Sequence, residues 1–192
     1  LEVSGIVIDS RKVEPGYLFI AIKGERADGH SFIPSVFAKG AACVLCERAP
    51  GHPAGPYILV ESCLEALKSL AEYYRSTLSI PIVGITGSVG KTSTKEMIAS
   101  VLEQKYKVLK TEGNFNNEIG LPLTIFRIRE EHEAAVLEMG ISDFGEMTRL
   151  SRMAKPNLCV ITNIGLCHLE NLKDRDGILK AKTEMFGEAQ PG

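Results

Sequence analysis

The sequence lacks a long hydrophobic run and lacks any cluster of charges of one sign. None of its apolar segments approaches the roughly 20 residues with which a helix crosses a membrane. Lysine and arginine total 22 against 24 acidic residues, so the net charge of −2 gives no electrostatic reason to expect a nucleic acid partner. The first residues, LEVSGIVIDSRKVEPG, also lack the basic and apolar regions of a secretion signal. We therefore expect a cytoplasmic protein that does not insert into membranes.

Cysteine pairing has little support, because the five cysteines are odd in number and complete no metal-ligand set. Three of them lie in apolar strand-like runs, and we predict that all are reduced and buried: Cys43, Cys46, Cys63, Cys159 and Cys167. The Cys43-x-x-Cys46 spacing also occurs in redox and zinc sites, but no second pair or nearby histidine accompanies it. We interpret this segment as a buried strand.

The hydrophobic fraction of 44% and the charged fraction of 24% are typical of a folded globular protein, and 192 residues are enough for two domains. The clearest break lies at residues 76–81, where a helical pattern ends and Pro81 opens a new apolar strand. We therefore predict one domain at residues 1–78 and a second at residues 79–192.

Both domains are predicted to belong to the α/β class. In the first, GIVID, YLFIAI, AACVLC and YILV have strand patterns, while SFIPSVFAKG and SCLEALKSLAEYYRSTL have helical patterns. In the second, strands are expected at 80–86, 107–111, 134–140 and 157–165, and helices at 91–106, 121–128, 145–154 and 176–189. Apolar strands separated by helices predict a parallel sheet covered on both faces, with ligands at the carboxyl ends of the strands.

The strongest local motif is Thr86-Gly87-Ser88-Val89-Gly90-Lys91-Thr92, which joins a strand to a helix. Glycines in such a turn let backbone N–H groups converge on phosphate oxygens at a helix N-terminus. Lys91 is then expected to neutralise the β- and γ-phosphates, and Thr92 to bind magnesium. The second domain is therefore predicted to be a partial P-loop ATPase domain. Its first helix is expected to turn Met97, Ile98, Val101 and Leu102 to one side.

The motif departs from the general pattern G-x-x-x-x-G-K-[ST], because Ile85 stands where glycine is expected and Gly84 comes one residue early. A glycine-rich turn with an exposed lysine is the alternative interpretation. The strand-to-helix context favours nucleotide binding, and it leaves the choice between ATP and GTP open.

Polar residues follow each of the three later strands: Thr111 with residues 113–117, Glu138, and residues 168–170. Because parallel strands end at one edge, we expect all of them beside the phosphate loop. A carboxylate such as Glu138 suits magnesium, and the imidazole of His168 suits a second metal. Taken singly, Glu138 also fits a helix N-terminus and His168 fits an ordinary loop.

Together these segments resemble the Mur ligases. The resemblance rests on the phosphate loop followed by Lys95-Glu96-Met97, on GNFNNEIGLP at 113–122, LEMG at 137–140, ITNIG at 161–165 and His168-Leu169-Glu170. The glycine spacing is a feature of that family's phosphate loop. The segment NFNNEIG resembles the branch that adds D-alanyl-D-alanine, whereas the branch that adds diaminopimelate or lysine usually has Thr-Thr-Pro there. Residues 9–16 and 28–33 resemble the family's UDP-binding domain.

The resemblance implies ATP, two Mg²⁺ ions and a set of site residues. Lys91 and Thr92 would hold ATP and magnesium, Glu138 and His168 would contact the two metal ions, and Asn117 would lie near the nucleotide or the sugar pyrophosphate. Ser10, Arg11, Asp28 and His30 would bind the UDP-linked substrate. Cys167 stands where relatives commonly have alanine, which leaves the role of His168 intact.

Lys182 matches the family's carbamylated lysine, whose CO2 adduct bridges metal ions and takes part in catalysis with Lys91 and His168. An unmodified lysine is a cation without a lone pair at neutral pH and cannot bridge metals. Without the resemblance, Lys182 would be interpreted as an exposed lysine on an amphipathic helix.

The function implied is ATP-dependent amide-bond formation between a UDP-N-acetylmuramoyl tripeptide and D-alanyl-D-alanine, through an acyl phosphate. We expect a monomer. The predicted sheet stops after four strands, so the 192 residues alone are expected to be a fragment without ligase activity. Another Mur-type ligase and a non-catalytic nucleotide-binding module remain alternatives. A P-loop kinase or GTPase is disfavoured because no guanine-reading sequence or switch element is found.

Overall fold

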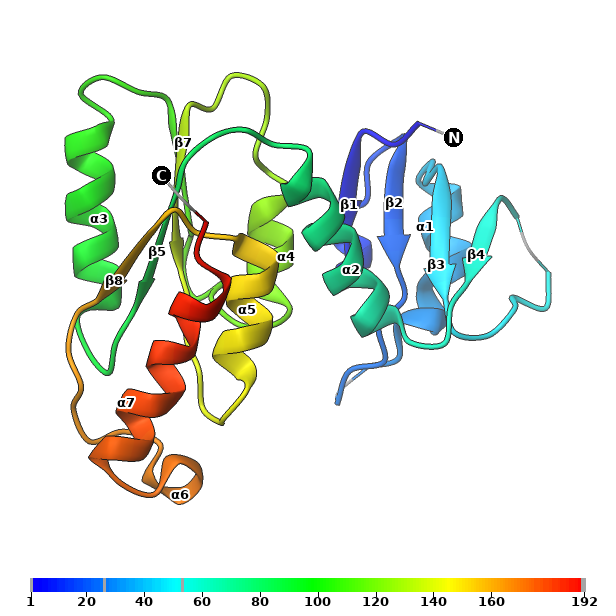
Figure 1. The fold of residues 1–192 in the computed structure, drawn as a ribbon. Helices are drawn as coiled ribbons and strands as arrows, with labels where there is room; N and C mark the ends of the chain where they lie inside the picture. The colour runs from blue at the N-terminus through cyan, green and yellow to red at the C-terminus, as the bar shows by residue number, and fades with distance from the viewer. Residues whose placement is uncertain (1, 26, 53, 191–192) are drawn as a thin grey trace. The chain divides into compact units, whose positions relative to one another are not determined.

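The computed structural model describes residues 2–25, 27–52 and 54–190 of the chain. These form two compact units, Leu1–Ser69 and Leu70–Gly192, each built around its own parallel sheet (Figure 1). The α/β class expected from the alternation of apolar strands and helices is confirmed.

The first unit contains a parallel sheet of four strands in the order β1-β2-β3-β4. The strands are β1 (Gly5–Val7), β2 (Tyr17–Ile20), β3 (Cys43–Cys46) and β4 (Tyr57–Leu59). Short 3-10 helices at Ser10–Lys12 and Gly29–Phe32 follow β1 and β2, and α1 (Ile33–Ala38) completes the connection to β3. The polar segments of this unit therefore start at the carboxyl ends of its strands.

The core of the first unit is formed by the two central strands and α1. Phe19, Val36 and Val44 are fully buried in one cluster, because β2 and β3 carry apolar side chains on both faces. The Cys43-x-x-Cys46 segment lies entirely within β3, and all four of its residues are buried. The interpretation of this segment as a buried strand is confirmed.

Helix α2 (Cys63–Ser76) begins in the first unit and ends in the second. Its last turn is attached to the second unit, where Tyr74 Oη donates to the Ile128 carbonyl at 2.5 Å and Arg75 Nε donates to the Ala154 carbonyl at 2.8 Å. The division between units therefore falls inside this helix, whereas the sequence suggests a boundary at residues 78/79, after it.

The second unit has a parallel sheet in the order β6-β7-β5-β8. The strands are β5 (Ile82–Thr86), β6 (Val108–Lys110), β7 (Ala134–Glu138) and β8 (Leu158–Ile161). The helices are α3 (Lys91–Leu102), α4 (Gly120–Ile125), α5 (Glu146–Ala154), α6 (Leu169–Leu172) and α7 (Arg175–Thr183), followed by a 3-10 helix at Glu184–Glu188. Helix α3 lies on one side of the sheet, and α4 and α5 lie on the other (Figure 1). The expectation of a parallel sheet covered on both faces is confirmed.

The expectation that Met97, Ile98, Val101 and Leu102 share one side of the first helix is wrong. Ile98 and Leu102 pack on the core with Ala99, whereas Met97 and Val101 are 70% and 72% exposed. The physical reason is the helical repeat of 3.6 residues, which places neighbours such as 97 and 98 about 100° apart, so that one face of a sheet covers only part of the set.

One further expectation needs correction. Cys159 and Cys167 are half-buried, whereas Cys43, Cys46 and Cys63 are buried; all five are free thiols. Residues 169–172 form the short helix α6, to which the sequence patterns assigned no element. No helix within the three described ranges is both long enough and apolar enough to span a membrane.

Candidate functional site

The carboxyl ends of the four strands of the second unit bring the candidate residues to one edge of the sheet. Strand β5 lies between β7 and β8, so the turn that follows Thr86 lies between the ends of those two strands. Glu138 is the last residue of β7, and Thr162 directly follows β8. The sheet order therefore places an acid on one side of the turn and the 162–168 segment on the other.

The turn after β5 depends on glycine at two positions. Gly87 has φ +150, and a Cβ there would lie 1.9 Å from Thr162 Oγ1. Gly90 has φ +80 and serves as the N-cap of α3, a left-handed conformation that residues with a Cβ adopt at a cost. The Lys91 ammonium donates to the Gly87 carbonyl at 2.9 Å. The two glycines thus let a tight turn lead directly into the helix that carries Lys91.

The unusual glycine spacing has a packing explanation. Ile85 is fully buried within β5 and packs in a cluster with Ala99 and Val136. A Cβ at Gly84 would lie 2.6 Å from Met139 Cε and 3.1 Å from Pro156 Cβ. The Ile85 side chain therefore packs in the core, and position 84 has little room for a side chain.

The backbone of the turn is held by the segment that follows β8. The Asn163 side-chain oxygen accepts hydrogen bonds from the backbone N–H groups of Ser88 (3.1 Å) and Val89 (3.0 Å). The Thr162 hydroxyl donates to the Val89 carbonyl at 2.6 Å. Among the residues that the structure describes, no side chain caps the N-terminus of α3 at Gly90, so the first-turn N–H groups point out of the helix without an internal partner. Such a helix start is an anion-binding arrangement.

Glu138 is the central polar residue of this edge. Its side chain accepts hydrogen bonds from the Thr92 hydroxyl at 2.9 Å and from the Asn116 amide at 2.8 Å, although the residue is only 2% exposed. Its backbone N–H donates to the Thr111 hydroxyl at 2.9 Å. The structure thus brings together Thr92 and Glu138, which were proposed from the sequence as metal ligands, and adds Asn116.

These donors fit a magnesium-bound nucleotide. Hydroxyl and carboxylate oxygens are the ligand types that Mg²⁺ takes, with phosphate oxygens completing its shell. The Thr86 hydroxyl is buried at the end of β5 and has no hydrogen-bond partner among the described residues, which leaves a polar atom in the phosphate loop for a ligand. No cluster of three His, Cys, Asp or Glu side chains occurs in the described ranges, so the protein alone offers a sparse ligand set.

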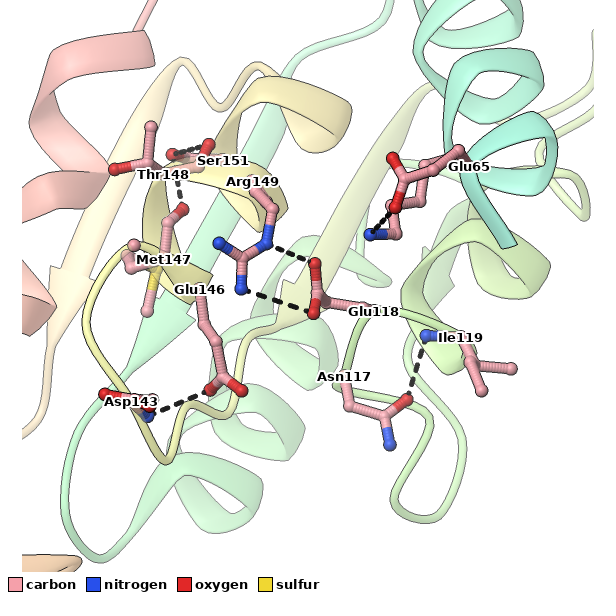
Figure 2. A network of polar contacts seen from close by, with 12 residues as sticks. Glu65, Asn117, Glu118, Ile119, Asp143, Glu146, Met147, Thr148, Arg149 and Ser151 are labelled. Carbon is pink, nitrogen blue, oxygen red and sulfur yellow. Dashed lines mark hydrogen bonds and ion pairs between the residues drawn. The ribbon is translucent and has the colours of Figure 1, made fainter. Parts of the chain in front are cut away.

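Asn117, the other amide of the 113–117 segment, has a local structural role. Its side-chain oxygen accepts from the backbone N–H groups of Ile119 (3.2 Å) and Gly120 (2.8 Å), which caps the start of α4. Figure 2 shows its amide nitrogen turned away from that backbone. The next residue, Glu118, pairs with Arg149 Nε of α5 at 2.5 Å (Figure 2). Asn117 therefore keeps only its amide N–H groups for a ligand.

The segment that follows β8 brings Cys167, rather than His168, into contact with the phosphate loop. The Cys167 thiol lies 3.1 Å from the Ser88 hydroxyl. His168 has φ +50 at the start of α6, its side chain is 40% exposed, and its Nδ1 lies 4.0 Å from Glu170 Oε1. Across the described part of the chain, His168 forms no hydrogen bond or ion pair with Glu138 or Thr92.

Lys182 is buried, which rules out its interpretation as an exposed helix lysine. It lies in α7 and is 2% exposed, and within the described ranges its ammonium has no hydrogen-bond or ion-pair partner. Burial lowers the pKa of Lys182; the Cys167 thiol opposes this shift and the charge of Lys91 adds to it. Close by in sequence, Glu184 accepts from the backbone N–H groups of Gly145 (3.1 Å) and Thr148 (3.2 Å) at the start of α5. This contact joins the end of α7 to α5.

In the first unit, Ser10 and Arg11 lie in the 3-10 helix that follows β1. Arg11 is 87% exposed and pairs with Asp9 at 2.8 Å, and this hydrogen-bonded guanidinium lowers the pKa of Asp9 to about 2. The Lys39 ammonium donates to the Ser10 carbonyl at 2.7 Å. Both residues expected near the substrate therefore lie at a strand end, Arg11 exposed with its charge partly balanced and Ser10 half-buried.

Asp28 and His30, which follow β2, belong to a hydrogen-bond network that connects the buried His30 ring to the exposed Arg48 guanidinium. Asp28 accepts from the backbone and Nδ1 of His30 and from Arg48, and the His30 backbone N–H is the main cause of its lowered pKa. His30 Nε2 accepts from the Glu47 N–H at 2.9 Å. Both ring nitrogens are thus occupied within the protein. A pocket of about 360 Å³ adjoins this network and is lined by His30, Ser31, Phe37, Arg48 and His52, among others.

Three contributors to the site were not singled out from the sequence: Asn116, Thr162 and Asn163. Each lies in a motif that was recognised as a whole. The signal available was their position directly after a strand, but that signal does not tell which of two neighbouring side chains faces the phosphate loop.

Comparison with protein families gives two matches that together cover most of the chain. A model described as the Mur ligase middle domain matches residues 85–192, and one described as the Mur ligase family, catalytic domain matches residues 2–75. The first match alone includes more than half of the sequence.

Similar individual proteins carry ligase names. The UDP-N-acetylmuramoyl-tripeptide–D-alanyl-D-alanine ligase of Bacillus subtilis is 50% identical over 96% of this chain and 41% of its own length. The structure of MurF from Acinetobacter baumannii has a TM-score of 0.93 at 37% identity, covering 98% of this chain and 42% of that one. The MurF ligase from Thermotoga maritima, solved with ADP, has a TM-score of 0.89 at 38% identity over 97% of this chain and 43% of that chain. The chain thus spans about two fifths of the length of these proteins, and it belongs to the Mur ligase family.

Proposed function

We propose that this chain supplies the nucleotide-binding and UDP-substrate-binding parts of an ATP-dependent ligase that joins D-alanyl-D-alanine to a UDP-N-acetylmuramoyl tripeptide. The names of its similar relatives support the choice of reaction. Because the chain spans only part of their length, the activity is assigned to the longer protein of which such a chain would be part.

The observation that carries the proposal is the meeting of Thr92, Glu138 and Asn116 at the phosphate loop. A non-catalytic nucleotide-binding module needs the loop but gives no reason for a buried acid aligned on the hydroxyl of Thr92. A buried carboxylate is costly unless it is paired, so its presence here favours a cation as the natural partner.

The chain's own residues hold and orient the phosphates. The N–H groups at the start of α3 and the Lys91 ammonium would bind the β- and γ-phosphates, as they do in this type of loop. Thr92 and Glu138 would hold Mg²⁺, which, when bound, offsets the negative charge that spreads over the transferred phosphoryl group. His168 and Lys182 are proposed to serve a second ion, as the family resemblance implies.

In the proposed reaction, a carboxylate oxygen of the tripeptide attacks the γ-phosphorus of ATP and ADP leaves, which gives an acyl phosphate. The amino group of D-alanyl-D-alanine then attacks the acyl carbon, inorganic phosphate leaves and the amide bond forms. Residues of this chain contribute by fixing the phosphates in line and by neutralising charge, which is how enzymes accelerate phosphoryl transfer.

Lys182 suits the role of a carbamylated lysine in two respects. It is buried without a partner in the described ranges, and burial lowers its pKa, which raises the fraction of the neutral amine that reacts with CO2. Carbamylation converts a buried unpaired cation into an anion, and an anion is a suitable ligand for metal ions.

We propose that the first unit binds the UDP end of the tripeptide substrate. Ser10 offers a hydroxyl and Arg11 an exposed guanidinium, and Arg48 beside Asp28 and His30 lines the neighbouring pocket. A guanidinium suits the diphosphate and a pocket wall of apolar side chains suits a planar base.

Five free thiols agree with a reducing compartment, so we propose a cytoplasmic location. We also propose that the protein is a monomer.

The test is ligation by the full-length protein. Phosphate release should require ATP, Mg²⁺, the UDP-linked tripeptide and D-alanyl-D-alanine together. Replacing D-alanyl-D-alanine with diaminopimelate or lysine, and the tripeptide with the dipeptide form, tests the alternative Mur-type activity. If the protein binds ATP but releases phosphate with none of these substrate combinations, it is a nucleotide-binding module and the proposal is contradicted.

A further inference from the structure

Lys95 is a fully buried lysine below the phosphate loop. It is 1% exposed and ranks with Phe19 among the largest fully buried side chains of the protein. Lysine is almost never buried to this extent unless its ammonium is paired. Its position in α3, one helical turn after Lys91, places it on the same side of the helix as the phosphate-loop lysine.

The Lys95 ammonium is fixed by a main-chain carbonyl at the end of the neighbouring strand. Nζ donates to the Thr111 carbonyl at 2.6 Å and pairs with Glu96 Oε1 at 3.1 Å. Glu96 is half-exposed and shares its other oxygen with Lys110 at 2.8 Å. The Lys95 ammonium is therefore directed to the Thr111 carbonyl, and the half-exposed Glu96 carboxylate balances its charge.

Thr111 connects Lys95 to the candidate metal ligand. The residue is completely buried; its N–H donates to the Val136 carbonyl at 3.1 Å, and its hydroxyl accepts the Glu138 N–H at 2.9 Å. Thr111 thus accepts one hydrogen bond from the Lys95 ammonium at its carbonyl and another from the Glu138 N–H at its hydroxyl. Moving Thr111 would move the backbone from which the Glu138 carboxylate projects.

Thr111 also begins the loop that holds the carboxylate from the other side. Asn116 lies in this loop and donates to Glu138 Oε1 at 2.8 Å, and its carbonyl accepts the Gly140 N–H at 2.8 Å. Glu138 Oε2 faces Thr92 of α3, the helix that carries Lys95. A closed chain of hydrogen bonds therefore leads from Lys95 of α3 to Thr111, from Thr111 to Glu138, and from Glu138 back to α3 at Thr92.

We propose that Lys95 is a positioning residue for the metal ligand: it ties the start of α3 to the end of β6 and so fixes the Glu138 carboxylate opposite the Thr92 hydroxyl. The inference rests on the proposed function, because it assumes that Glu138 and Thr92 hold the Mg²⁺ of a nucleotide. Outer partners that orient a metal ligand commonly change metal affinity by roughly 10- to 100-fold when removed.

The test compares the Kd of ADP with Mg²⁺ and with EDTA, by calorimetry on the full-length protein. Lys95→Met keeps the length of the side chain and removes its donors. We expect the gain in ADP affinity from Mg²⁺ to fall about tenfold or more, with the Mg²⁺-free Kd changed less than about twofold. A role in folding alone would lower the fraction of binding-competent protein without changing this ratio.

Lys110→Met is the matched control, because the half-buried Lys110 pairs with the same Glu96, whereas the ammonium that binds the Thr111 carbonyl belongs to Lys95. Both Kd values should stay at the wild-type level. Thr111→Val removes the hydroxyl that accepts the Glu138 N–H, and so tests the connection between Lys95 and Glu138 at the Glu138 end. This variant provides the deciding measurement if Lys95→Met does not fold. It should reduce the Mg²⁺-dependent gain in the same way.

Equal weakening of ADP binding with and without Mg²⁺ in either variant, or no change in both, would overturn the positioning role. In that case the wild-type protein still binds Mg²⁺-ADP and the proposed function stands. Failure of the wild-type protein to bind Mg²⁺-ADP would overturn the proposed function, and the inference with it.

Discussion

The Thr92 hydroxyl donates a hydrogen bond of 2.9 Å to the Glu138 carboxylate, across two elements that are 46 residues apart in sequence. Thr92 lies in the first turn of α3, the helix after the phosphate loop, and Glu138 is the last residue of β7. In the proposed function, this hydroxyl and this carboxylate would both bind the same Mg²⁺ ion. The contact gives a structural reason for treating an acid far from the phosphate loop as part of the nucleotide site.

Replacing Glu138 with glutamine should weaken Mg²⁺-dependent ADP binding. The amide keeps the size of the side chain and removes its negative charge, and charge-assisted contacts are worth about 1.5–3 kcal/mol, or roughly 10- to 100-fold in Kd. Calorimetry with Mg²⁺ and with EDTA measures the effect. Glu112→Gln, a change at an exposed acid of the 111–117 loop, is the control and should leave both Kd values unchanged. Unaltered Mg²⁺ dependence in Glu138→Gln would remove Glu138 from the metal site.

Replacing Gly87 with alanine should abolish nucleotide binding while the protein stays folded. The new Cβ would lie 1.9 Å from Thr162 Oγ1, so the phosphate loop must move away from the segment that holds it. Gly90→Ala is the matched comparison, since its Cβ meets nothing within 4 Å and only the φ of +80 opposes it. This second change should cost about 1 kcal/mol and retain binding. ADP titrations of both variants test the difference, and equal affinities would contradict it.

Arg75, at the end of α2, should matter more for stability than Arg152, an exposed arginine of α5. Its guanidinium donates to the carbonyls of Ala154 (2.8 Å), Leu78 (2.8 Å) and Lys155 (3.2 Å), and the residue is 6% exposed. Arg75→Met should lower the free energy of unfolding by roughly 2–4 kcal/mol, because one buried and two part-buried carbonyls lose a charged donor. The exposed Arg152, whose nearest acid lies 3.7 Å away, should cost less than about 1 kcal/mol when changed to alanine. Urea unfolding measures both, and equal losses would refute this account.

The fold of this chain could be predicted from the sequence because its strands are continuous apolar runs bounded by glycine, proline or a change to helical spacing. IVGIT and AAVLE are such runs, and both became central strands of the parallel sheet. What the sequence could not give was the face of α3 that is covered, because Met97 and Val101 have the same apolar character as Ile98 and Leu102. Only the position of the sheet decides between them.

The candidate site could be predicted to the level of the motif but not of the side chain. Asn116 and Asn117 are chemically identical neighbours, yet one donates to Glu138 and the other caps α4. Their different roles follow from the path of the loop, which local spacing does not determine. Likewise, the helical pattern around Lys182 fits an exposed lysine, and only the packing of α7 within the folded unit buries it.

Lys182 should make the protein less stable at neutral pH than a variant with an apolar side chain of similar length. Burial lowers its pKa in the folded state, so the folded state binds this proton less readily than the unfolded chain does. Below the lowered pKa both states are charged and the penalty is complete; as the pH rises from there toward the usual lysine pKa of about 10.4, the wild-type protein regains stability. Lys182→Met should therefore raise the Tm at pH 7 in CO2-depleted buffer, by about 2–4 °C for each kcal/mol gained, and the advantage should shrink at pH 9.5.

Lys180→Met, a change at an exposed lysine of the same helix, is the control for that measurement and should leave the Tm unchanged at both pH values. Adding bicarbonate at neutral pH should stabilise the wild-type protein with Mg²⁺ and nucleotide but not Lys182→Met, because only a lysine can form the carbamate. A wild-type Tm that already exceeds that of Lys182→Met in the absence of CO2 would mean that the buried ammonium is favourably solvated, and the physical basis for carbamylation at this position would be lost.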